Sequence, residues 1–412
     1  MSDTKPFEIS KLVVMEAYKR VKANRGAAGI DDESIDEFEK DLKGNLYKIW
    51  NRMSSGTYFP PAVKQVEIPK AKGGMRTLGI PTVSDRIAQM VVKSYLEPTL
   101  EPIFHESSYG YRPHRSPIQA IRKARQLCFQ YPWVLEFDIK GLFDNIDHDL
   151  LMKAVRKHTS EKWILLYIER WLKAPFQTQD GEIITRTAGT PQGGVISPLL
   201  ANLFLHYGFD SWMSRTRPHL PFERFADDGI IHCRSHGEAK CTMVSLAKRL
   251  RQCKLEIHPD KTNVIYCKDG KRPKEYPDTK FTFLGYEFRA RLCKASGGRF
   301  FVGFTPAASR EAKKKLMDKI RKMKLPVRTE SSLQQLKEIL NPIMRGWINY
   351  FSVFYKSSLQ DTVRHVNQVI INWAIRKFKR FRRSRGRATN WLRGIYTENP
   401  RLFAHWSLNW SA

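Results

Sequence analysis

The sequence lacks any apolar run approaching the roughly 20 residues that a membrane-spanning helix requires. Its amino terminus, MSDTKPFEIS, carries an early acidic residue and has neither an apolar signal core nor an arginine-rich transit pattern. Internal repeats and low-complexity tracts are also missing. We therefore expect a protein that makes no membrane contact and stays in the cytoplasm.

The cysteines show no C-x-x-C pairing, so neither a zinc ribbon nor a disulfide framework is indicated. We expect reduced thiols with mostly structural roles. Cys267 and Cys293 with His258 offer an alternative metal site, but their loose spacing favours packing. The six cysteines are Cys128, Cys233, Cys241, Cys253, Cys267 and Cys293.

Acidic residues are scarce relative to basic ones. The chain of 412 residues has 41 Asp and Glu against 71 Lys and Arg, which gives a formal net charge of +30. Solubility requires far less charge, so the excess indicates a polyanionic partner, with nucleic acid as the first candidate. Because 42% of the residues are hydrophobic, the chain can fill a sizeable core, and its length allows two or three domains.

Three aspartates stand out against this basic background. Asp227 and Asp228 lie side by side in RFADDGIIH, and the Asp-Asp-Gly step predicts a tight hairpin turn. Asp138 ends the apolar run VLEF, which predicts a strand that passes into a turn at Gly141. Adjacent carboxylates repel one another and lose hydration when a sheet holds them near a third, and a divalent cation relieves that cost.

These carboxylates suit one kind of chemistry in particular. Two Mg²⁺ ions about 3.5 to 4 Å apart, bridged by carboxylates, stabilise both the attacking and the leaving oxygen in phosphoryl transfer. For the Asp-Asp-Gly tripeptide alone, an ordinary solvated β-turn is the alternative.

The remaining pattern mixes helices and strands. It predicts helices within residues 8–60, interrupted by a loop at NRGAAGIDDES, and over residues 84–100, 149–175 and 237–254. The stretch VEIPKAKGGMRTLGIPT predicts a hairpin, and NVIYC and FTFLGYEF predict further strands. Ser197 and Pro198 predict the start of a buried apolar helix. An α/β unit is therefore expected, followed from Ser309 by a basic, tryptophan-rich helical region.

Basic residues are concentrated near the carboxyl end. Between Arg376 and Arg393 there are nine basic residues and no acidic one. A solvated helix face is the usual meaning of such a run. Aromatic residues interleaved with arginines instead favour phosphate contact and base stacking.

Nine strings, in order along the chain, resemble the reverse transcriptases encoded by bacterial group II introns and their free-standing relatives. The resemblance implies an α/β (α+β) right-hand polymerase, with an antiparallel palm sheet flanked by helices, fingers, and an all-helical thumb. The implied domains are an N-terminal extension over 1–60, fingers over 61–130, palm over 131–305, and a maturase-like thumb with a basic arm over 306–412. The strings are ANRGAAGIDD, IPKAKGGMRTLGIPTVSDRIAQ, SSYGYRPHRSPIQAI, FDIKGLFDNIDHDLL, GTPQGGVISPLLANLFL, RFADD, IHPDKT, FLGYEF and RGWINYF.

The resemblance also implies a catalytic centre. Asp138, Asp227 and Asp228 match the palm carboxylates, and Asp138, Ile139 and Asp227 would bind two Mg²⁺ ions, for which Mn²⁺ can substitute. These ions activate the primer 3′ hydroxyl and stabilise the leaving pyrophosphate. Phe143 matches the aromatic residue that excludes a ribose 2′ hydroxyl, and a core Phe is the alternative.

Further residues match nucleotide-binding positions. Lys70 and Arg76 match fingers residues that grip the triphosphate, a task that needs permanent charge; solvated hairpin charges are the alternative. Gln192 matches the loop beside the nucleotide and the template base, where glycines let the backbone come close to the ligand. Lys261 matches a position beside the palm and Arg112 one that contacts template, with structural ion pairs as the alternative for both. The other implied template and primer contacts are Asn24, Gly26, Arg115, Gly285, Arg345, Arg376, Arg380, Arg382 and Arg383.

The expected function is RNA-directed DNA synthesis on an RNA template, with a DNA or RNA primer and dNTPs, and with structured intron RNA as a further partner. A chiefly RNA-binding splicing factor, and a domesticated enzyme in host DNA repair or defence, are alternatives. An RNA-dependent RNA polymerase is disfavoured by Phe143. Phe225 replaces the Tyr usual in the family, and we expect activity to persist because the carboxylates are untouched. No cysteine-paired endonuclease module follows the thumb, so we expect no DNA cleavage by this chain.

Overall fold

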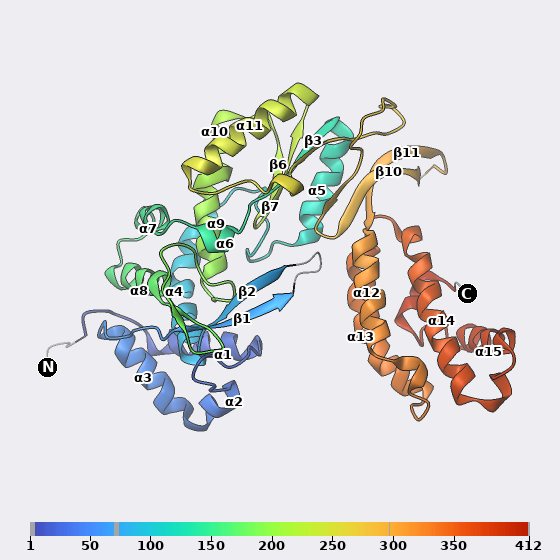
Figure 1. Ribbon diagram of the computed structural model, residues 1–412, viewed down its shortest axis with the longest axis horizontal. Coiled ribbons are helices and arrows are strands. Elements are labelled where there is room, and N and C mark those ends of the chain that lie inside the picture. Colours follow the sequence, from blue (N-terminus) through green and yellow to red (C-terminus); the bar gives the residue numbers. More distant parts are fainter. Residues whose placement is uncertain (1–4, 70–73, 296, 411–412) are drawn as a thin grey trace. The chain divides into compact units, whose positions relative to one another are not determined.

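The computed structural model describes residues 5–69, 74–295 and 297–410. The chain divides into two compact units (Figure 1). Unit 1 comprises Met1–Ser116 and Leu135–Asn263, and unit 2 comprises Pro117–Val134 and Val264–Ala412. Each unit is therefore built from two stretches of chain.

Unit 1 combines helices with short strands. Its α-helices are α1 (Lys11–Ala23), α2 (Ile35–Phe38), α3 (Leu42–Ser54), α4 (Val83–Leu100), α6 (Leu142–Asn145), α7 (His148–Arg156), α8 (Lys162–Lys173), α9 (Ser197–Leu205), α10 (Ser211–Thr216) and α11 (His236–Gln252). A π-helix, η3 (His206–Asp210), joins α9 to α10, and short 3₁₀ helices are η1 (Glu39–Asp41), η2 (Glu101–Ile103) and η4 (Pro259–Lys261). The strands are β1 (Val63–Pro69), β2 (Met75–Ile80), β4 (Phe176–Gln177), β5 (Ile183–Ile184), β6 (Phe222–Phe225) and β7 (Asp228–Cys233), together with β3 (Trp133–Asp138), whose first two residues fall in unit 2.

Unit 2 is mainly helical. Its α-helices are α5 (Pro117–Gln130), α12 (Arg310–Lys322), α13 (Leu333–Phe351), α14 (Gln360–Lys377) and α15 (Arg385–Glu398), with 3₁₀ helices η5 (Leu325–Val327), η6 (Lys356–Leu359), η7 (Lys379–Phe381) and η8 (Ala404–Leu408). Its strands are β9 (Phe281–Phe283), β10 (Tyr286–Lys294) and β11 (Phe300–Ala308), and β8 (Asn263–Tyr266) begins at the division between the units.

Several helices begin at a serine whose side chain accepts a hydrogen bond from the backbone of the first turn. Ser10 starts α1, Ser235 starts α11 and Ser309 starts α12 in this way. The buried helix α9 begins at Ser197 with Pro198 in its first turn, as the sequence predicts. Local capping chemistry therefore sets many of the helix starts that could be read from the sequence.

The first sheet of unit 1 has the strand order β2-β1-β4-β5. β1 and β2 form the predicted hairpin, with Lys64 opposite Ile80 and Pro69 opposite Met75. β4 pairs in parallel with β1. The hairpin carries Arg76 near its tip.

The second sheet contains β6, β7 and β3 as neighbours in that order. β6 and β7 are antiparallel, from Phe222 opposite Ile231 to Phe225 opposite Asp228. The turn between them consists of Ala226 and Asp227, so Asp228 already belongs to β7. The hairpin is thus present as predicted, but its turn lies one residue earlier than the Asp-Asp-Gly reading suggests.

In unit 2 the sheet order is β11-β10-β9, and β10 pairs with β11 along its whole length. Helix α5 contacts β11, where Nε of Arg125 donates to Oγ1 of Thr305 at 3.0 Å. Helix α14 contacts α12 and α15 (Figure 1). Its Trp373 and Asn367 are fully buried, and Asn367 accepts a hydrogen bond from Nε1 of Trp406 at 2.9 Å. This packing gives the carboxyl-terminal helices a core of their own.

The expected α/β class is confirmed, with differences in detail. The helix predicted over 149–175 is two helices, α7 and α8, and β11 was not predicted. The four-part domain division stays a prediction, since the two compact units have other boundaries. All six cysteines are free, as predicted. Within the described residues no helix is both long and apolar enough to cross a membrane.

Candidate active site

The second sheet of unit 1 brings the end of β3 next to the β6–β7 turn. The backbone N–H of Ile139 donates to the carbonyl of Asp227 at 3.2 Å. The carbonyl of Asp138 accepts from the N–H of His258 at 2.8 Å. Three aspartates that are remote in sequence, Asp138, Asp227 and Asp228, therefore lie together at one edge of the sheet.

The cluster is electrostatically unfavourable without a cation. Burial raises the pKa of Asp228 to about 7, with further contributions from the charges of Asp227 and Asp138. Burial also raises the pKa of Asp227, to which Asp138 adds. Nζ of Lys261 donates to Oδ2 of Asp138 at 2.9 Å and provides part of the missing positive charge. The aspartates are thus crowded, partly buried and only partly neutralised.

The donor chemistry of this cluster fits a hard divalent cation. Mg²⁺ and Mn²⁺ prefer oxygen ligands, and carboxylates whose pKa is raised by burial and by mutual repulsion gain most from such a cation. In the part of the chain that the structure describes, no group of three or more His, Cys, Asp or Glu side chains is already arranged around a common metal position. The fit therefore rests on the donor set and its charge.

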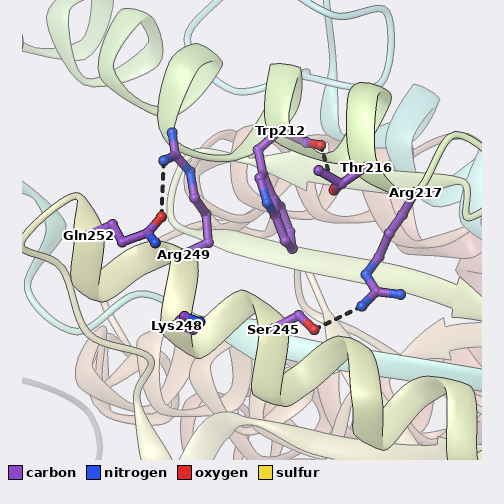
Figure 2. Close-up of a pocket in the computed structure, with 7 residues that line it drawn as sticks. All are labelled: Trp212, Thr216, Arg217, Ser245, Lys248, Arg249 and Gln252. Carbon is purple, nitrogen blue, oxygen red and sulfur yellow. Dashed lines mark hydrogen bonds between the residues drawn. The ribbon is translucent and has the colours of Figure 1, made fainter.

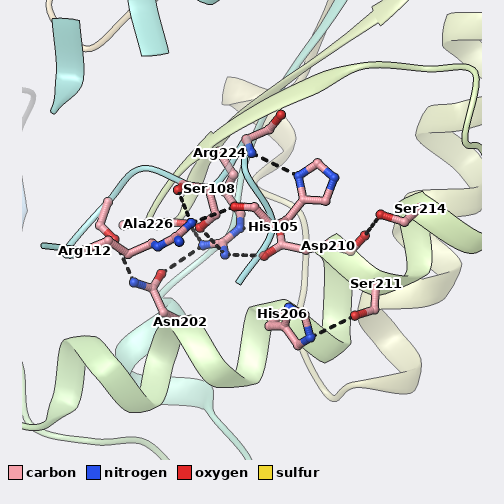
Figure 3. A network of polar contacts seen from close by, with 12 residues as sticks. His105, Ser108, Arg112, Asn202, His206, Asp210, Ser211, Ser214, Arg224 and Ala226 are labelled. Carbon is pink, nitrogen blue, oxygen red and sulfur yellow. Dashed lines mark hydrogen bonds and ion pairs between the residues drawn. The ribbon is translucent and has the colours of Figure 1, made fainter. Parts of the chain in front are cut away.

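A buried arginine supports the turn that carries these aspartates (Figure 3). Arg224 of β6 forms an ion pair with Asp210 in which neither side chain is exposed, with Nη2 2.6 Å from Oδ2. Its Nη1 donates to the carbonyl of Ala226 at 3.1 Å and to Oδ1 of Asn202 at 3.2 Å. Nη2 also donates to Oγ of Ser108 at 2.8 Å. One guanidinium thus links β6, the π-helix, α9 and the loop after η2.

The same network fixes the loop that leads to Tyr111. The N–H of Tyr109 donates to the carbonyl of Arg224 at 2.9 Å, and Nδ2 of Asn202 donates to the carbonyl of Gly110 at 2.7 Å. Tyr111 itself is 50% exposed, and its ring centroid lies 6.2 Å from that of Phe143. An aromatic wall next to the aspartates results.

Phe143 and Phe225 both belong to this wall. Phe143 is only 7% exposed and lies in α6, directly after the turn that follows β3. Its carbonyl accepts from the N–H of Thr190 at 2.7 Å. Phe225 lies 6.5 Å from Tyr111 between ring centroids and precedes the turn. The ring of Phe143 therefore packs within this wall, and its role as a boundary for the sugar stays a prediction.

Two predicted nucleotide-binding residues contact each other. Nε of Arg76 donates to Oε1 of Gln192 at 2.8 Å, and Nε2 of Gln192 lies 3.5 Å from Oδ2 of Asp144. The loop is held to β2 because the N–H of Gly79 donates to the carbonyl of Gln192 at 2.8 Å. Lys70 falls outside the described residues.

Position 193 requires glycine for a structural reason, in addition to the close approach to a ligand that is expected from the sequence. Its φ is +123°, and a Cβ built there would lie 2.4 Å from the carbonyl oxygen of Gly79. Only glycine allows this backbone approach. The close neighbour seen here is strand β2, so the glycine sets the position of Gln192 against that strand.

Among the predicted template contacts in unit 1, Arg112 is engaged within the protein. Its Nη2 lies 2.7 Å from Oε1 of Glu101, and Nη1 donates to the carbonyls of His105 and Ser108. The ion-pair alternative is therefore present for Arg112, as it is for Lys261, while template contact stays a prediction for both.

The other template positions of unit 1 lie near the surface. Asn24 caps the end of α1 and is exposed. A Cβ at Gly26 would lie 1.9 Å from Nη1 of Arg86, so glycine leaves room for that arginine. Arg115 lies over the ring of Tyr109 at 5.8 Å.

The remaining predicted template contacts belong to unit 2. Gly285 has a φ of +80° in the β9–β10 turn, and its carbonyl accepts from the N–H of Ser309. The arginines are all exposed, and Arg380 lies 4.7 Å from the ring of Phe381. These exposed arginines are Arg345, Arg376, Arg380, Arg382 and Arg383.

Sequence reasoning missed the buried support of the site. Arg224 stands in the quoted RFADD string, but its partner Asp210 lies 14 residues earlier and Ser108 lies 116 residues earlier. One signal in the sequence could have indicated this support. A charged residue inside an apolar strand segment requires a buried partner. Tyr111 also stood in a quoted string without an assigned role.

Two protein-family models match parts of the chain. The model of the family described as reverse transcriptase (RNA-dependent DNA polymerase) matches residues 68–288, which is more than half of the chain. The model described as group II intron, maturase-specific domain, matches residues 313–391.

Individual proteins are also similar to this chain in sequence. Group II intron-encoded protein LtrA of Lactococcus lactis subsp. cremoris is 37% identical over 193 residues, covering 46% of this chain and 32% of LtrA. Protein YkfC of Escherichia coli (strain K12) is 31% identical over 313 residues, covering 66% of this chain and 78% of YkfC. The putative COX1/OXI3 intron 1 protein of Saccharomyces cerevisiae is 30% identical over 203 residues, covering 49% and 24%. The match thus spans about a third of LtrA, and the chain belongs to the reverse transcriptase (RNA-dependent DNA polymerase) family, with a match to the group II intron maturase-specific domain.

Proposed function

We propose that this chain is an RNA-directed DNA polymerase of the group II intron type, which adds dNTPs to a primer 3′ hydroxyl on an RNA template. The observation that carries the proposal is the meeting of Asp138, Asp227 and Asp228 at one sheet edge, in a member of the reverse transcriptase family. Burial and the neighbouring carboxylate charges raise the pKa of Asp227 and Asp228, which supports a site that works with bound cations.

In this proposal Asp138, Asp227 and the carbonyl of Ile139 hold two Mg²⁺ ions, with Mn²⁺ as a substitute, and Asp228 completes the carboxylate cluster. Bound ions would supply electrostatic stabilisation of the attacking 3′ oxygen and of the leaving pyrophosphate. The protein's own contribution is to keep the carboxylates aimed at one place. Lys261 offsets charge on Asp138 and would be free to turn toward a phosphate once a cation binds there.

The residues around the cluster would bind and select the nucleotide. Arg76 and Gln192 form one hydrogen-bonded pair, so they can present a cation and an amide to the triphosphate together with Lys70. Phe143 would exclude a ribose 2′ hydroxyl because its position is set by packing and by the carbonyl bond to Thr190. Correct alignment of primer and nucleotide would then account for much of the rate enhancement.

The proposed division of labour follows the right-hand scheme, with an extension over 1–60, fingers over 61–130, palm over 131–305 and thumb over 306–412. An RNA template and a DNA or RNA primer would contact the exposed arginines of unit 2. Structured intron RNA is a further proposed partner, supported by the maturase-specific match over residues 313–391. A domesticated enzyme without an intron would use the same site.

The experiment is primer extension with oligo(dT) on poly(rA) in the presence of Mg²⁺ and dTTP. Asp227→Asn should abolish extension while RNA affinity stays within about twofold of wild type, because one charge is lost without a change of shape. Asp180→Asn, at an exposed turn, is the matched control and should extend normally. Normal extension by Asp227→Asn would refute the assignment of this aspartate.

A second measurement does not depend on activity. Cation binding to the folded state should raise the Tm of the wild-type protein by mass action. The rise should be lost in Asp138→Asn and kept in Asp180→Asn. An equal rise in all three proteins would show that the cations bind elsewhere.

A further inference from the structure

Three neighbouring cavities lie on the helical side of unit 1, among α7, the α9–η3–α10 segment and α11. Their volumes are about 340, 280 and 650 Å³. The first two share Arg249 and Gln252, and the last two share Lys157 and Tyr207. Because each neighbouring pair shares lining residues, the three cavities adjoin one another, and we name them together the helical groove.

The groove is lined by positive charge alone. In the described part of the chain no Asp or Glu lines any of the three cavities. The ion pairs found between described residues include none of its six Lys and Arg side chains. These six residues are Lys153, Lys157, Arg215, Arg217, Lys248 and Arg249. Cations gathered without carboxylates repel one another, so the arrangement favours a polyanionic ligand.

Aromatic rings lie among these charges. Figure 2 shows the indole of Trp212 between Arg249 and Arg217, directed toward α11. Nζ of Lys157 lies 4.8 Å from the centroid of the Tyr207 ring, and both residues line the groove. Partly exposed rings beside lysine and arginine suit a ligand that offers bases or ribose together with phosphates.

Part of the groove is already held in place by internal hydrogen bonds. Nε and Nη2 of Arg249 donate to the carbonyls of Gly208 and Tyr207 in the π-helix, at 3.1 and 2.9 Å. Nη2 of Arg217 donates to Oγ of Ser245 at 2.8 Å (Figure 2). The two guanidinium groups therefore have defined positions, while the ammonium groups of the lysines between and beside them donate to no acceptor among the residues that the structure describes. A ligand would meet a surface that needs little reordering.

None of the groove residues belongs to the proposed active site or to the predicted template and primer contacts. We propose that the helical groove binds the phosphodiester backbone of an RNA strand, as a contact separate from the template–primer duplex. An acidic protein is the less suitable occupant, because three of the six cations are lysines, which are depleted at protein–protein interfaces. The proposal rests on the proposed function only for the choice of RNA as the polyanion.

The experiment is equilibrium binding of the full chain, without dNTPs, to a folded RNA of several hundred nucleotides over a range of salt concentrations. The variant Lys153→Gln/Lys157→Gln/Lys248→Gln removes three exposed cations that make no hydrogen bond to the rest of the described protein. Lys123→Gln/Lys162→Gln/Lys240→Gln removes three exposed cations elsewhere and is the matched control.

We expect the groove variant to bind the folded RNA roughly 10 to 100 times more weakly at low salt, with the control close to wild type. The slope of log K against log salt should become shallower by about 2, since each phosphate contact contributes about 0.7 to 0.9. Extension of oligo(dT) on poly(rA) at saturating template should stay within about twofold. Loss of binding with normal extension separates this proposal from the proposed function, which fails only if extension itself fails.

An independent readout is photocrosslinking with RNA that contains 5-bromouridine. Crosslinks at Trp212 or Tyr207, lost in the groove variant and kept in the control, would support direct RNA contact. Unchanged affinity and an unchanged salt slope in the groove variant would overturn the proposal and would leave an acidic protein as the occupant to test.

Discussion

Arg224 donates to the carbonyl of Ala226 at 3.1 Å from a guanidinium that is wholly buried. Ala226 has a φ of +59°, a conformation that residues other than glycine seldom adopt. The next residue is Asp227. The hydrogen bond therefore helps to hold the turn in the conformation that directs Asp227 and Asp228 toward Asp138, although Arg224 touches none of these carboxylates.

Arg224→Lys tests this positioning role. Lysine keeps the charge but cannot bond Asp210, Asn202 and Ala226 at once. We expect a loss of about 1 to 3 kcal/mol in the free energy of unfolding, because buried acceptors lose their donor while the charge is kept, and at least a hundredfold fall in the primer-extension rate. Urea denaturation and single-turnover extension measure the two effects.

Ala226→Gly separates positioning from stability. Glycine adopts a positive φ without strain, so the Tm should be unchanged or slightly higher. The turn becomes more flexible, however, and we expect kcat to fall about tenfold with little change in KM. Wild-type kcat in this variant would contradict the idea that a rigid turn aims the carboxylates.

Phe143→Ala tests the sugar boundary. Removing a buried ring should cost about 3 to 5 kcal/mol of stability, and it should increase incorporation of rNTPs relative to dNTPs by at least tenfold in a competition assay. Phe143→Leu keeps most of the buried volume and serves as the control for stability. If sugar discrimination is unchanged in a folded Phe143→Ala protein, the ring acts only in the core.

The parts that could be predicted from sequence are those set by local chemistry. The β6–β7 hairpin, the serine caps and the start of α9 follow from short patterns that contain their own cause. The approach of Asp138 to Asp227, by contrast, depends on strand order, and spacing alone does not specify which strands become neighbours. The resemblance to a family supplied that information.

The support of the site could not be predicted for the same reason. Arg224 needs Asp210 from a π-helix and Ser108 from a distant loop, so its partners are defined only by tertiary packing.

Strand β11 contains Gly303 and Pro306, two residues that argue against a strand, yet pairing with β10 outweighs their propensity. The sequence left two roles open for Arg112, a template contact and a structural ion pair. The structure shows that Arg112 is buried and forms an ion pair with Glu101.

The exposed arginines of unit 2 give a prediction on RNA affinity. Arg380→Gln/Arg382→Gln/Arg383→Gln should weaken binding to all sequences alike and reduce the salt slope by about 2, because phosphate contacts carry no base information. Arg385 is left unchanged, since it donates to Gln368 within the protein. An unchanged salt slope would mean that these arginines only face solvent.

The last prediction concerns Asp85, a fully buried aspartate of α4. It accepts hydrogen bonds from the hydroxyl of Tyr58 at 2.9 Å, Nε1 of Trp171 at 2.7 Å and Nε2 of Gln89 at 2.9 Å. Burial raises its pKa to about 6, although these three donors each oppose the shift. The hydrogen bonds therefore compensate only part of the lost hydration.

A raised pKa in the folded state means that folding takes up a proton between the unfolded pKa near 4 and the folded value near 6. The contribution of Asp85 to stability is present below about pH 4 and is lost as the pH rises to about 6, at about 1.4 kcal/mol per pH unit. The Asp85→Asn variant has no carboxyl group to titrate at this position. The amide nitrogen of the new asparagine would face the Nε2 donor of Gln89, so the variant should be less stable than the wild type at every pH in this range. The stability difference between wild type and variant should therefore shrink as the pH rises from about 4 to about 6. Urea denaturation across this range measures it, and a difference that grows with pH would show that Asp85 is already ionised in the folded protein at about pH 4.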